Sequence, residues 1–173
     1  MKKQLAIFLF LLFCPLSGAL FAQSKVGHVN TKMVLDTIPS RQKGLKEIQE
    51  ITRKSEAELM EQDKLLQKAY TDYMGKKGEQ SQTVNQYEEN RIQKMQQDLQ
   101  SREQELNDQI QKISMALNEN TYGMVKEAVK VVASKKGLQY VIDQDSALFS
   151  GGSDVTTEVI LEVLRLDALA KNP

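Results

Sequence analysis

Proline is absent from the sequence between Pro39 and Pro173, and this constrains the fold more than any other feature of the chain. Proline ends a helix because it lacks a backbone N–H and clashes with the preceding turn. The residues from 40 to about 125 are instead rich in Gln, Glu, Lys, Leu and Met, with few β-branched residues. That composition is typical of long exposed helices, so the middle of the chain is expected to be almost entirely helical.

Two long helices separated by one turn are expected in this segment. In residues 40–74 the apolar side chains recur at heptad spacing, but Thr52, Ser55 and Gln62 occupy positions of the same stripe. Such a pattern is typical of a weak coiled-coil seam. The segment GKKGEQSQ, residues 75–82, contains two glycines among polar residues and predicts a helix–helix turn.

The second helix is expected over residues 82–136. Its apolar residues include Met95, Leu106 and Leu117, which recur every eleven positions, a spacing that gives nearly straight packing. Gly137 is expected to end the helix in the left-handed conformation. At a rise of 1.5 Å per residue, about 55 helical residues extend for about 80 Å. The pattern therefore predicts an elongated arm.

Strands are expected only near the two ends of the chain. Three short segments are β-branched or apolar: residues 25–30, 138–143 and 147–150. Because the two long helices fold back on each other, the first strand is expected to pair with the last two. Asp143 to Asp145 would turn a hairpin, and Asp154 or Thr156 would cap a short amphipathic helix that closes the chain.

The first 22 residues have the parts of a secretory signal peptide: two lysines, an unbroken apolar run at 5–13, and then small residues. Cleavage is expected after Ala22, with cleavage after Ala19 as the alternative. Removing 22 of the 173 residues leaves a mature chain of 151, in size one ordinary domain. The only cysteine, Cys14, would be lost with the signal peptide. A mature chain without disulfides depends on packing or on assembly for its stability.

The charge of the mature chain is close to neutral, with 21 basic against 23 acidic residues once Lys2 and Lys3 are removed. A nucleic-acid partner would require a basic face, so none is expected. Three strands and a short helix make a small core for so long an arm. Oligomerisation is therefore expected from size alone.

The segment QYVIDQDSALFSGGSDVT, residues 139–156, is the one that most resembles a site of chemistry. Its Asp143, Asp145, Ser146 and Asp154 could be a calcium or magnesium cluster, but the ligand alternation of an EF-hand loop is absent. The alternative is that these residues turn the chain and cap a helix. His28 is the only histidine; it is expected to pack in a strand at a subunit interface. We expect no catalytic residue, no metal and no cofactor.

The N-terminal strand KVGHVN, the charged helical hairpin, and the ending GLQYVIDQDSALFSGGSDVTTEVILEVL resemble the Skp/OmpH family of periplasmic chaperones. The resemblance covers the whole mature chain, and its most specific part is the C-terminal block. It implies a mainly α fold with a small β component: a long antiparallel helical-hairpin (coiled-coil) arm, residues 40–117, on a small β-rich trimerisation body. That body would be discontinuous, with residues 23–39 and 118–173.

The resemblance also implies a function. Family members are homotrimers that hold unfolded outer-membrane proteins in a cavity between their arms, without ATP, in the periplasm. They are not enzymes. In such a trimer, the apolar residues of the strands are expected at the subunit interface: Val26, Val29, Val141, Ile142, Leu148 and Phe149. The family's arms are strongly basic and have been linked to anionic membrane surfaces. This chain is near neutral, with pairs such as Glu50–Lys54 and Asp98–Arg102 at i,i+4 spacing, so membrane-surface contact is not expected to carry over.

The outer half of the arm carries the candidates for client contact. Flexible thioethers and amphipathic tyrosines suit promiscuous apolar binding, although they could equally fill a loose seam between the helices. The candidates are Met60, Tyr70, Tyr73, Met74, Tyr87 and Met95. Gly123 lies in NENTYG, the poorest helix-forming stretch of the second helix, and is a hinge candidate. The alternative is that Gly123 allows another helix to approach closely.

Two other kinds of function are compatible with parts of the pattern. A structural periplasmic coiled-coil adaptor also places a helical hairpin between strands, but it needs further β-domains for which 151 residues leave no room. An enzyme would have to use Asp143 and Asp145, and unchanged activity after mutation of both would count against it.

Overall fold

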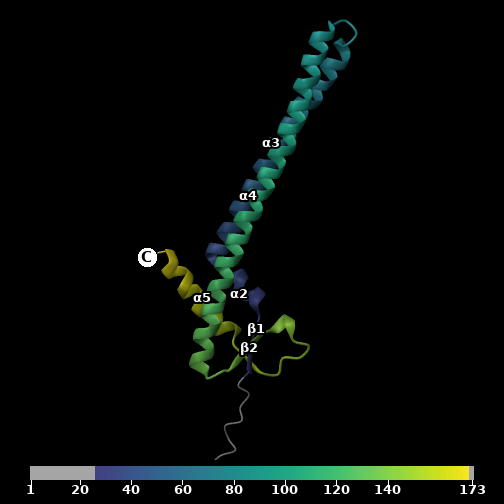
Figure 1. The fold of residues 1–173 in the computed structure, drawn as a ribbon. Coiled ribbons are helices and arrows are strands. Elements are labelled where there is room, and N and C mark those ends of the chain that lie inside the picture. Colours follow the sequence, from purple (N-terminus) through teal and green to yellow (C-terminus); the bar gives the residue numbers. More distant parts are fainter. Residues whose placement is uncertain (1–25, 172–173) are drawn as a thin grey trace, which may run out of the picture. The chain divides into compact units, whose positions relative to one another are not determined.

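The computed structural model describes residues 26–171, so the expected signal peptide lies outside the described residues. The chain is mostly helical, with long helices and one small sheet, as predicted (Figure 1). It divides into two compact units. Among the described residues, the body unit combines residues 26–37 with residues 124–171, and the arm unit is Ile38–Gly123.

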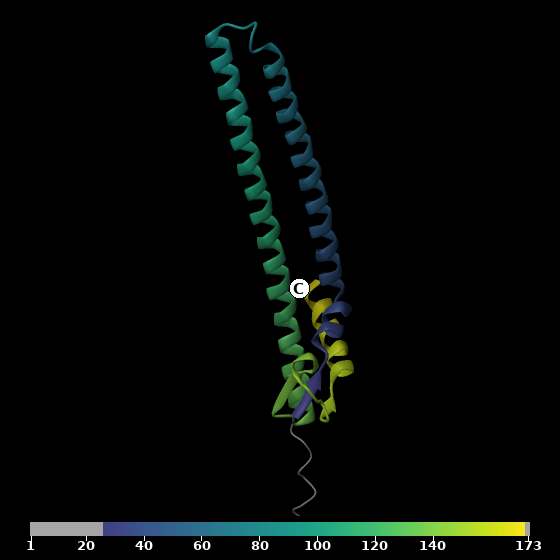
Figure 2. The same cartoon turned by 90° about the vertical axis from the view of Figure 1, so that its right-hand side faces the viewer.

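The arm unit is built from α3 (Pro39–Lys76) and the first part of α4 (Gln82–Lys136). Pro39 occupies the first turn of α3, where its missing N–H leaves no hydrogen bond unmade. The two helices lie side by side and are joined by the turn at 77–81 (Figures 1 and 2). They run in opposite directions, because the contacts between them join residues ever closer in sequence: Arg41 with Asn118, Glu58 with Arg102, and Tyr73 with Glu89.

The heptad stripe of α3 is the face that becomes buried, including its polar positions. Ser55 is buried, whereas Thr52 and Gln62 are half-buried. The Thr52 hydroxyl donates to the Ile48 carbonyl at 2.9 Å, which satisfies it within its own helix. The hydroxyl of Thr52 is therefore accommodated by a local hydrogen bond.

The C-terminus of α4 ends as predicted. Gly137 has φ +65°, the left-handed conformation that glycine adopts without strain. The N–H of Leu138 donates to the Ala133 carbonyl at 2.9 Å, and the N–H of Gly137 donates to Ser134 at 3.3 Å. Those two bonds are the Schellman arrangement, and they satisfy carbonyls that the helix leaves free.

The sheet of the body unit has three parallel strands in the order β2-β1-β3. The central strand β1 (Val26–Val29) lies between β2 (Tyr140–Asp143) and β3 (Ser153–Asp154), and His28 is the register partner of both Ile142 and Asp154. The N-terminal strand therefore does pair with the C-terminal segments, as expected from the fold-back of the helices.

The predicted strand at 147–150 and the predicted hairpin are both wrong. After β2 the chain makes a single 3-10 turn, η1 (Gln144–Ser146), and residues 147–150 are not in a strand. The third strand is β3, which pairs with the opposite edge of β1 and not with β2. The physical reason is that β2 and β3 both run parallel to β1, so the chain must cross back from the end of β2 to the start of β3. Residues 147–150 belong to this connection and not to a strand.

Two helices complete the body unit. The short α2 (Thr31–Thr37), which the sequence did not predict, packs against α5 (Thr156–Lys171). Asn30 begins α2, since its side chain accepts a hydrogen bond from the N–H of Met33 at 2.8 Å. The core between these elements is made mainly of valine: Val29, Val34, Val125, Val132, Val155, Val159 and Val163, with Leu35 and Ala128.

Candidate functional site

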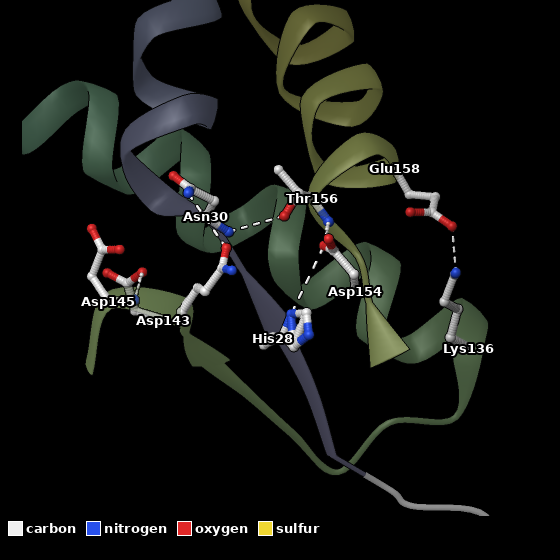
Figure 3. A network of polar contacts seen from close by, with 9 residues as sticks. His28, Asn30, Lys136, Asp143, Asp145, Asp154, Thr156 and Glu158 are labelled. Atoms are coloured by element: carbon white, nitrogen blue, oxygen red, sulfur yellow. Dashed lines mark hydrogen bonds and ion pairs between the residues drawn. The ribbon is translucent and has the colours of Figure 1, made fainter. Parts of the chain in front are cut away.

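Polar side chains gather where the strands of the body unit end (Figure 3). The N–H of Asn30 donates to the Thr156 hydroxyl at 3.0 Å, and the Asn30 amide lies 3.4 Å from the Gln144 side-chain oxygen. Asp154 accepts from the N–H of Thr156 at 2.9 Å. The hydroxyl and the N–H of Thr156 lower the pKa of the Asp154 carboxyl below its ordinary value. Asp154 therefore caps α5 as an ionised carboxylate, as predicted.

The chemistry that this polar cluster could perform is limited by how its carboxylates are used. Asp143 accepts from the N–H of Asp145 at 3.4 Å and so caps the 3-10 turn. His28 is buried within the body unit itself, with Nδ1 3.9 Å from the nearest Asp154 oxygen. Its burial therefore needs no neighbouring subunit, contrary to expectation. Among residues 26–171, no three His, Cys, Asp or Glu side chains are grouped as a metal ion would require.

An exposed apolar surface lies on the body unit. Leu148 and Phe149 have exposed fractions of 109% and 88%, and Tyr140 and Ile142 are also exposed. Tyr140 and Ile142 alternate along β2, so both side chains lie on the same side of the sheet. The edge of β2 away from β1 pairs with no other strand of the described chain. We call these four side chains the body patch.

The predicted interface residues separate into three groups in the structure. Ile142, Leu148 and Phe149 belong to the body patch, whereas Val26 and Val141 are half-buried. Val29 is buried in the core of the chain itself and so offers no free surface. Tyr140, which was not among the predicted interface residues, belongs to the patch. Its two-residue spacing from Ile142 could have revealed it.

A second exposed apolar surface lies on the arm unit. Met60, Tyr70 and Met74 are all more than half exposed. At about 100° per residue, these three positions of α3 fall within about 80° of one another, beside the buried seam. Tyr87, on α4, is exposed as well. We call Met60, Tyr70 and Met74 the arm stripe.

The other two predicted client contacts do not lie on an open surface. Tyr73 has an exposed fraction of only 6% and its hydroxyl donates to Glu89, so it packs between the helices. Burial raises the pKa of the Tyr73 hydroxyl, and the bond that Tyr73 donates lowers the pKa of Glu89. Met95 is half-buried, and its sulfur lies 3.7 Å from an Arg91 guanidinium nitrogen. For Tyr73 the prediction of client contact is therefore wrong, because its position belongs to the heptad seam.

Charges on the arm are paired, but not as the i,i+4 spacing predicted. Arg102 donates to Glu58 of the facing helix at 2.7 Å instead of pairing with Asp98. This guanidinium lowers the pKa of the Glu58 carboxyl. Glu50 pairs with Arg53 at 3.0 Å instead of Lys54. Lys77 lies near both Glu89, at 3.0 Å, and the Tyr73 ring. These ion pairs interleave charges of both signs on the arm unit.

The remaining candidate, Gly123, lies at the last position of the arm unit. A Cβ built on Gly123 meets no atom within 4 Å. Among the described residues, no other helix therefore packs closely against Gly123. None of the helices in residues 26–171 combines the length and apolar character that crossing a bilayer requires.

Comparisons with known proteins agree with this architecture. The family described as outer membrane protein (OmpH-like) matches residues 25–163. Among solved structures, the chain is similar to an OmpH-like protein of Caulobacter crescentus CB15, for which a role as outer membrane chaperone has been suggested. That similarity has a TM-score of 0.71 at 13% sequence identity, and it covers 84% of this chain and 86% of the other. The curated proteins contain no significant match.

Proposed function

The chain belongs to the OmpH-like family of outer membrane proteins, and from this premise we propose that it is an ATP-independent holdase chaperone of the periplasm. In this proposal three chains form a homotrimer through their body units. Unfolded outer-membrane proteins are bound in the cavity between the arms, residues 40–117, and are thereby kept from aggregating. The protein performs no catalytic step and needs no cofactor.

The observation that carries the proposal is the exposure of the arm stripe. Methionine is among the residues most often buried in folded proteins, yet Met60 and Met74 are exposed beside Tyr70 on the surface of α3. A thioether adapts its shape to many partners, and a tyrosine contributes a large apolar face with a polar end. The stripe thus supports contact with many unrelated apolar sequences.

Weak contacts repeated over several arms would explain binding without ATP. A fully buried apolar side chain contributes about 1.5–3 kcal/mol, so a few such contacts hold an unfolded chain yet still release it. Shielding the unpaired strands of the client prevents them from pairing with each other, which is the route to aggregation.

Assembly into a trimer is supported by the body patch. Leu148 and Phe149 are neighbours in sequence, and each is almost fully exposed in the single chain. A second copy that covered them, together with Ile142, would remove apolar surface from water. It would also give the free edge of β2 a partner.

Client binding is tested with purified mature protein and an outer-membrane β-barrel protein unfolded in urea. On dilution of the urea, the chaperone should suppress light scattering at about one trimer per client. Replacing the whole arm stripe by serine should weaken suppression at least about fivefold. Replacing Leu169 by serine, an exposed apolar residue of the body unit, is the matched control. A protein that fails to suppress aggregation, or a stripe variant that behaves like the control, contradicts the proposal.

Assembly is tested separately by light scattering of the protein alone. Ile142→Asp and Phe149→Asp each place an unpaired charge in the body patch and should reduce a trimer to monomers at micromolar concentration, because a buried unpaired charge costs several kcal/mol. Leu169→Asp should remain trimeric. If Ile142→Asp and Phe149→Asp stay trimeric, the interface lies elsewhere.

A further inference from the structure

Most methionines in the described part of the chain are exposed. Residues 26–171 contain six methionines, and Met33, Met60, Met74 and Met115 are each more than half exposed. The same residues contain no cysteine. With no thiol to compete, the exposed thioethers are the groups most easily oxidised by a two-electron oxidant.

The methionines on the outer half of the arm differ in how accessible their sulfur atoms are. Met60 and Met74 are 60% and 51% exposed, and both lie in the arm stripe. Met95 is half-buried, and its sulfur accepts a contact from the Arg91 guanidinium at 3.7 Å. A cation against the sulfur draws electron density from it and blocks one approach. Met60 and Met74 should therefore react before Met95.

We propose that Met60 and Met74 are reversible oxidation sites through which hypohalous acids weaken the binding of unfolded clients. This inference rests on the proposed function. In the reaction, the thioether sulfur attacks the oxygen of hypochlorous acid: an S–O bond forms, the O–Cl bond breaks, and chloride and a proton are released. The sulfur loses two electrons and the chlorine gains them. The product is methionine sulfoxide.

The sulfoxide changes the surface that contacts a client. A flexible apolar side chain becomes a strongly polar one, and an S=O group buried against an apolar client has no hydrogen-bond donor to satisfy it. The helix itself should be little affected, because both side chains project into solvent. Binding is therefore lost without unfolding. Methionine sulfoxide reductases, which return the thioether, should restore it.

The experiment uses the whole mature protein, treated with a few equivalents of hypochlorous acid and quenched with free methionine. Peptide mass spectrometry locates the added oxygen, circular dichroism monitors helix content, and fluorescence titration measures affinity for an unfolded outer-membrane β-barrel protein. Met60→Leu/Met74→Leu keeps the apolar volume but cannot form sulfoxide. Met33→Leu/Met115→Leu is the matched control, because it removes two equally exposed methionines outside the stripe.

Oxidation should lower the affinity of the wild type and of the control by about fivefold or more, and should leave the Met60→Leu/Met74→Leu protein within about twofold of its starting value. Treatment with the reductases should reverse the loss, which separates sulfoxide from chlorination of tyrosine. The inference is overturned if Met60→Leu/Met74→Leu loses as much affinity as the wild type, or if fully oxidised wild type binds unchanged. Absence of binding by the untreated protein would instead refute the proposed function.

Discussion

At the scale of single residues, Glu162 and Gly152 occupy positions of the body unit where the structure requires a particular residue. Glu162 is a charged residue in a buried position, and its carboxylate accepts from Arg165 at 2.6 Å and lies 3.6 Å from Lys135. The Arg165 guanidinium lowers the pKa of Glu162 below its ordinary value of 4.5. Gly152 precedes β3 at a point where the backbone approaches β1 closely.

We expect Glu162 to make the stability of the body unit depend on acid pH. A carboxyl whose pKa is lowered by folding contributes stability above its ordinary pKa of 4.5, and this stability is lost as the pH falls through the folded pKa. The midpoint of thermal unfolding, followed by circular dichroism, should therefore fall from about pH 5 downward. Glu162→Gln should unfold at a lower temperature at pH 7 and show a weaker decline in acid.

Glu47→Gln is the control for this prediction, because Glu47 pairs only with the exposed Lys43, at 3.8 Å. Surface pairs of this kind contribute little to stability. A Glu162→Gln protein whose midpoint at pH 7 and acid decline both equal those of the wild type would show that the buried carboxylate is energetically silent.

Gly152→Ala should destabilise the body unit by about 1–3 kcal/mol. A Cβ at this position would lie 2.7 Å from the carbonyl oxygen of Val26, which belongs to the backbone of β1 and cannot move without disturbing the sheet. The neighbouring Gly151→Ala is the control, because its Cβ would meet only the edge of the exposed Phe149 ring. Chemical denaturation measures the free energy of unfolding of both variants. Equal values would contradict the close approach of Gly152 to the backbone of Val26.

At the scale of elements, the two chain connections between the body unit and the arm unit differ. The first lies between Thr37 and Ile38, where Ile38 has φ −74° and ψ 113°, so that α2 ends before α3 begins. The second lies after Gly123, where α4 continues without interruption. A side chain added at Gly123 would meet no atom within 4 Å of its Cβ.

We expect Gly123→Ala to stabilise α4 by up to about 1 kcal/mol, because alanine favours the helix and nothing crowds its side chain. If Gly123 is a hinge, the substitution should also narrow the spread of distances between arm tips. Pulsed measurements with spin labels near Lys76 report that spread.

Gly44→Ala is the control, since its Cβ would lie 2.8 Å from a methyl group of Leu117. That clash would offset the stability that alanine adds to the helix. Identical distance distributions in the wild type and in Gly123→Ala would eliminate the hinge while leaving the stability prediction intact.

At the scale of the whole molecule, the near-neutral charge of the protein indicates which forces should bind its clients. In the expected mature chain, lysine and arginine number 21 and aspartate and glutamate number 23. On the arm unit these charges neutralise each other in pairs such as Glu58–Arg102 and Lys77–Glu89. Long-range steering of an anionic client or membrane needs an excess of one sign. Short-range apolar contact is therefore the expected source of affinity.

Client binding should accordingly depend only weakly on salt. Between low ionic strength and about 0.15 M, the dissociation constant should change by less than about tenfold. A protein of near-neutral charge exerts little long-range electrostatic attraction that salt could screen. A titration series in sodium chloride measures this. A larger loss of affinity would point to a basic lining in the assembled trimer and would restore a role at anionic membrane surfaces.

The amino-acid sequence by itself determined the helices and the family. The predicted helix at 40–74 is observed at Pro39–Lys76, and the predicted limits of the second, 82–136, are those observed. Those limits depend on local signals: the absence of proline, the glycines of the turn, and Gly137. The left-handed conformation of Gly137 ends the helix through contacts with residues next to it in the sequence. The C-terminal block pointed to the family that the comparison with known families shows.

Only the tertiary structure decided which residues meet across the chain. It placed β3 at Ser153–Asp154 on the far edge of β1, buried Tyr73 against the facing helix, and paired Arg102 with Glu58. In each case the deciding partner is far away in the sequence, and several partners were compatible with the local pattern. A strand or an ion pair forms only where a complementary edge or charge is brought within reach, and that is a property of the folded chain as a whole.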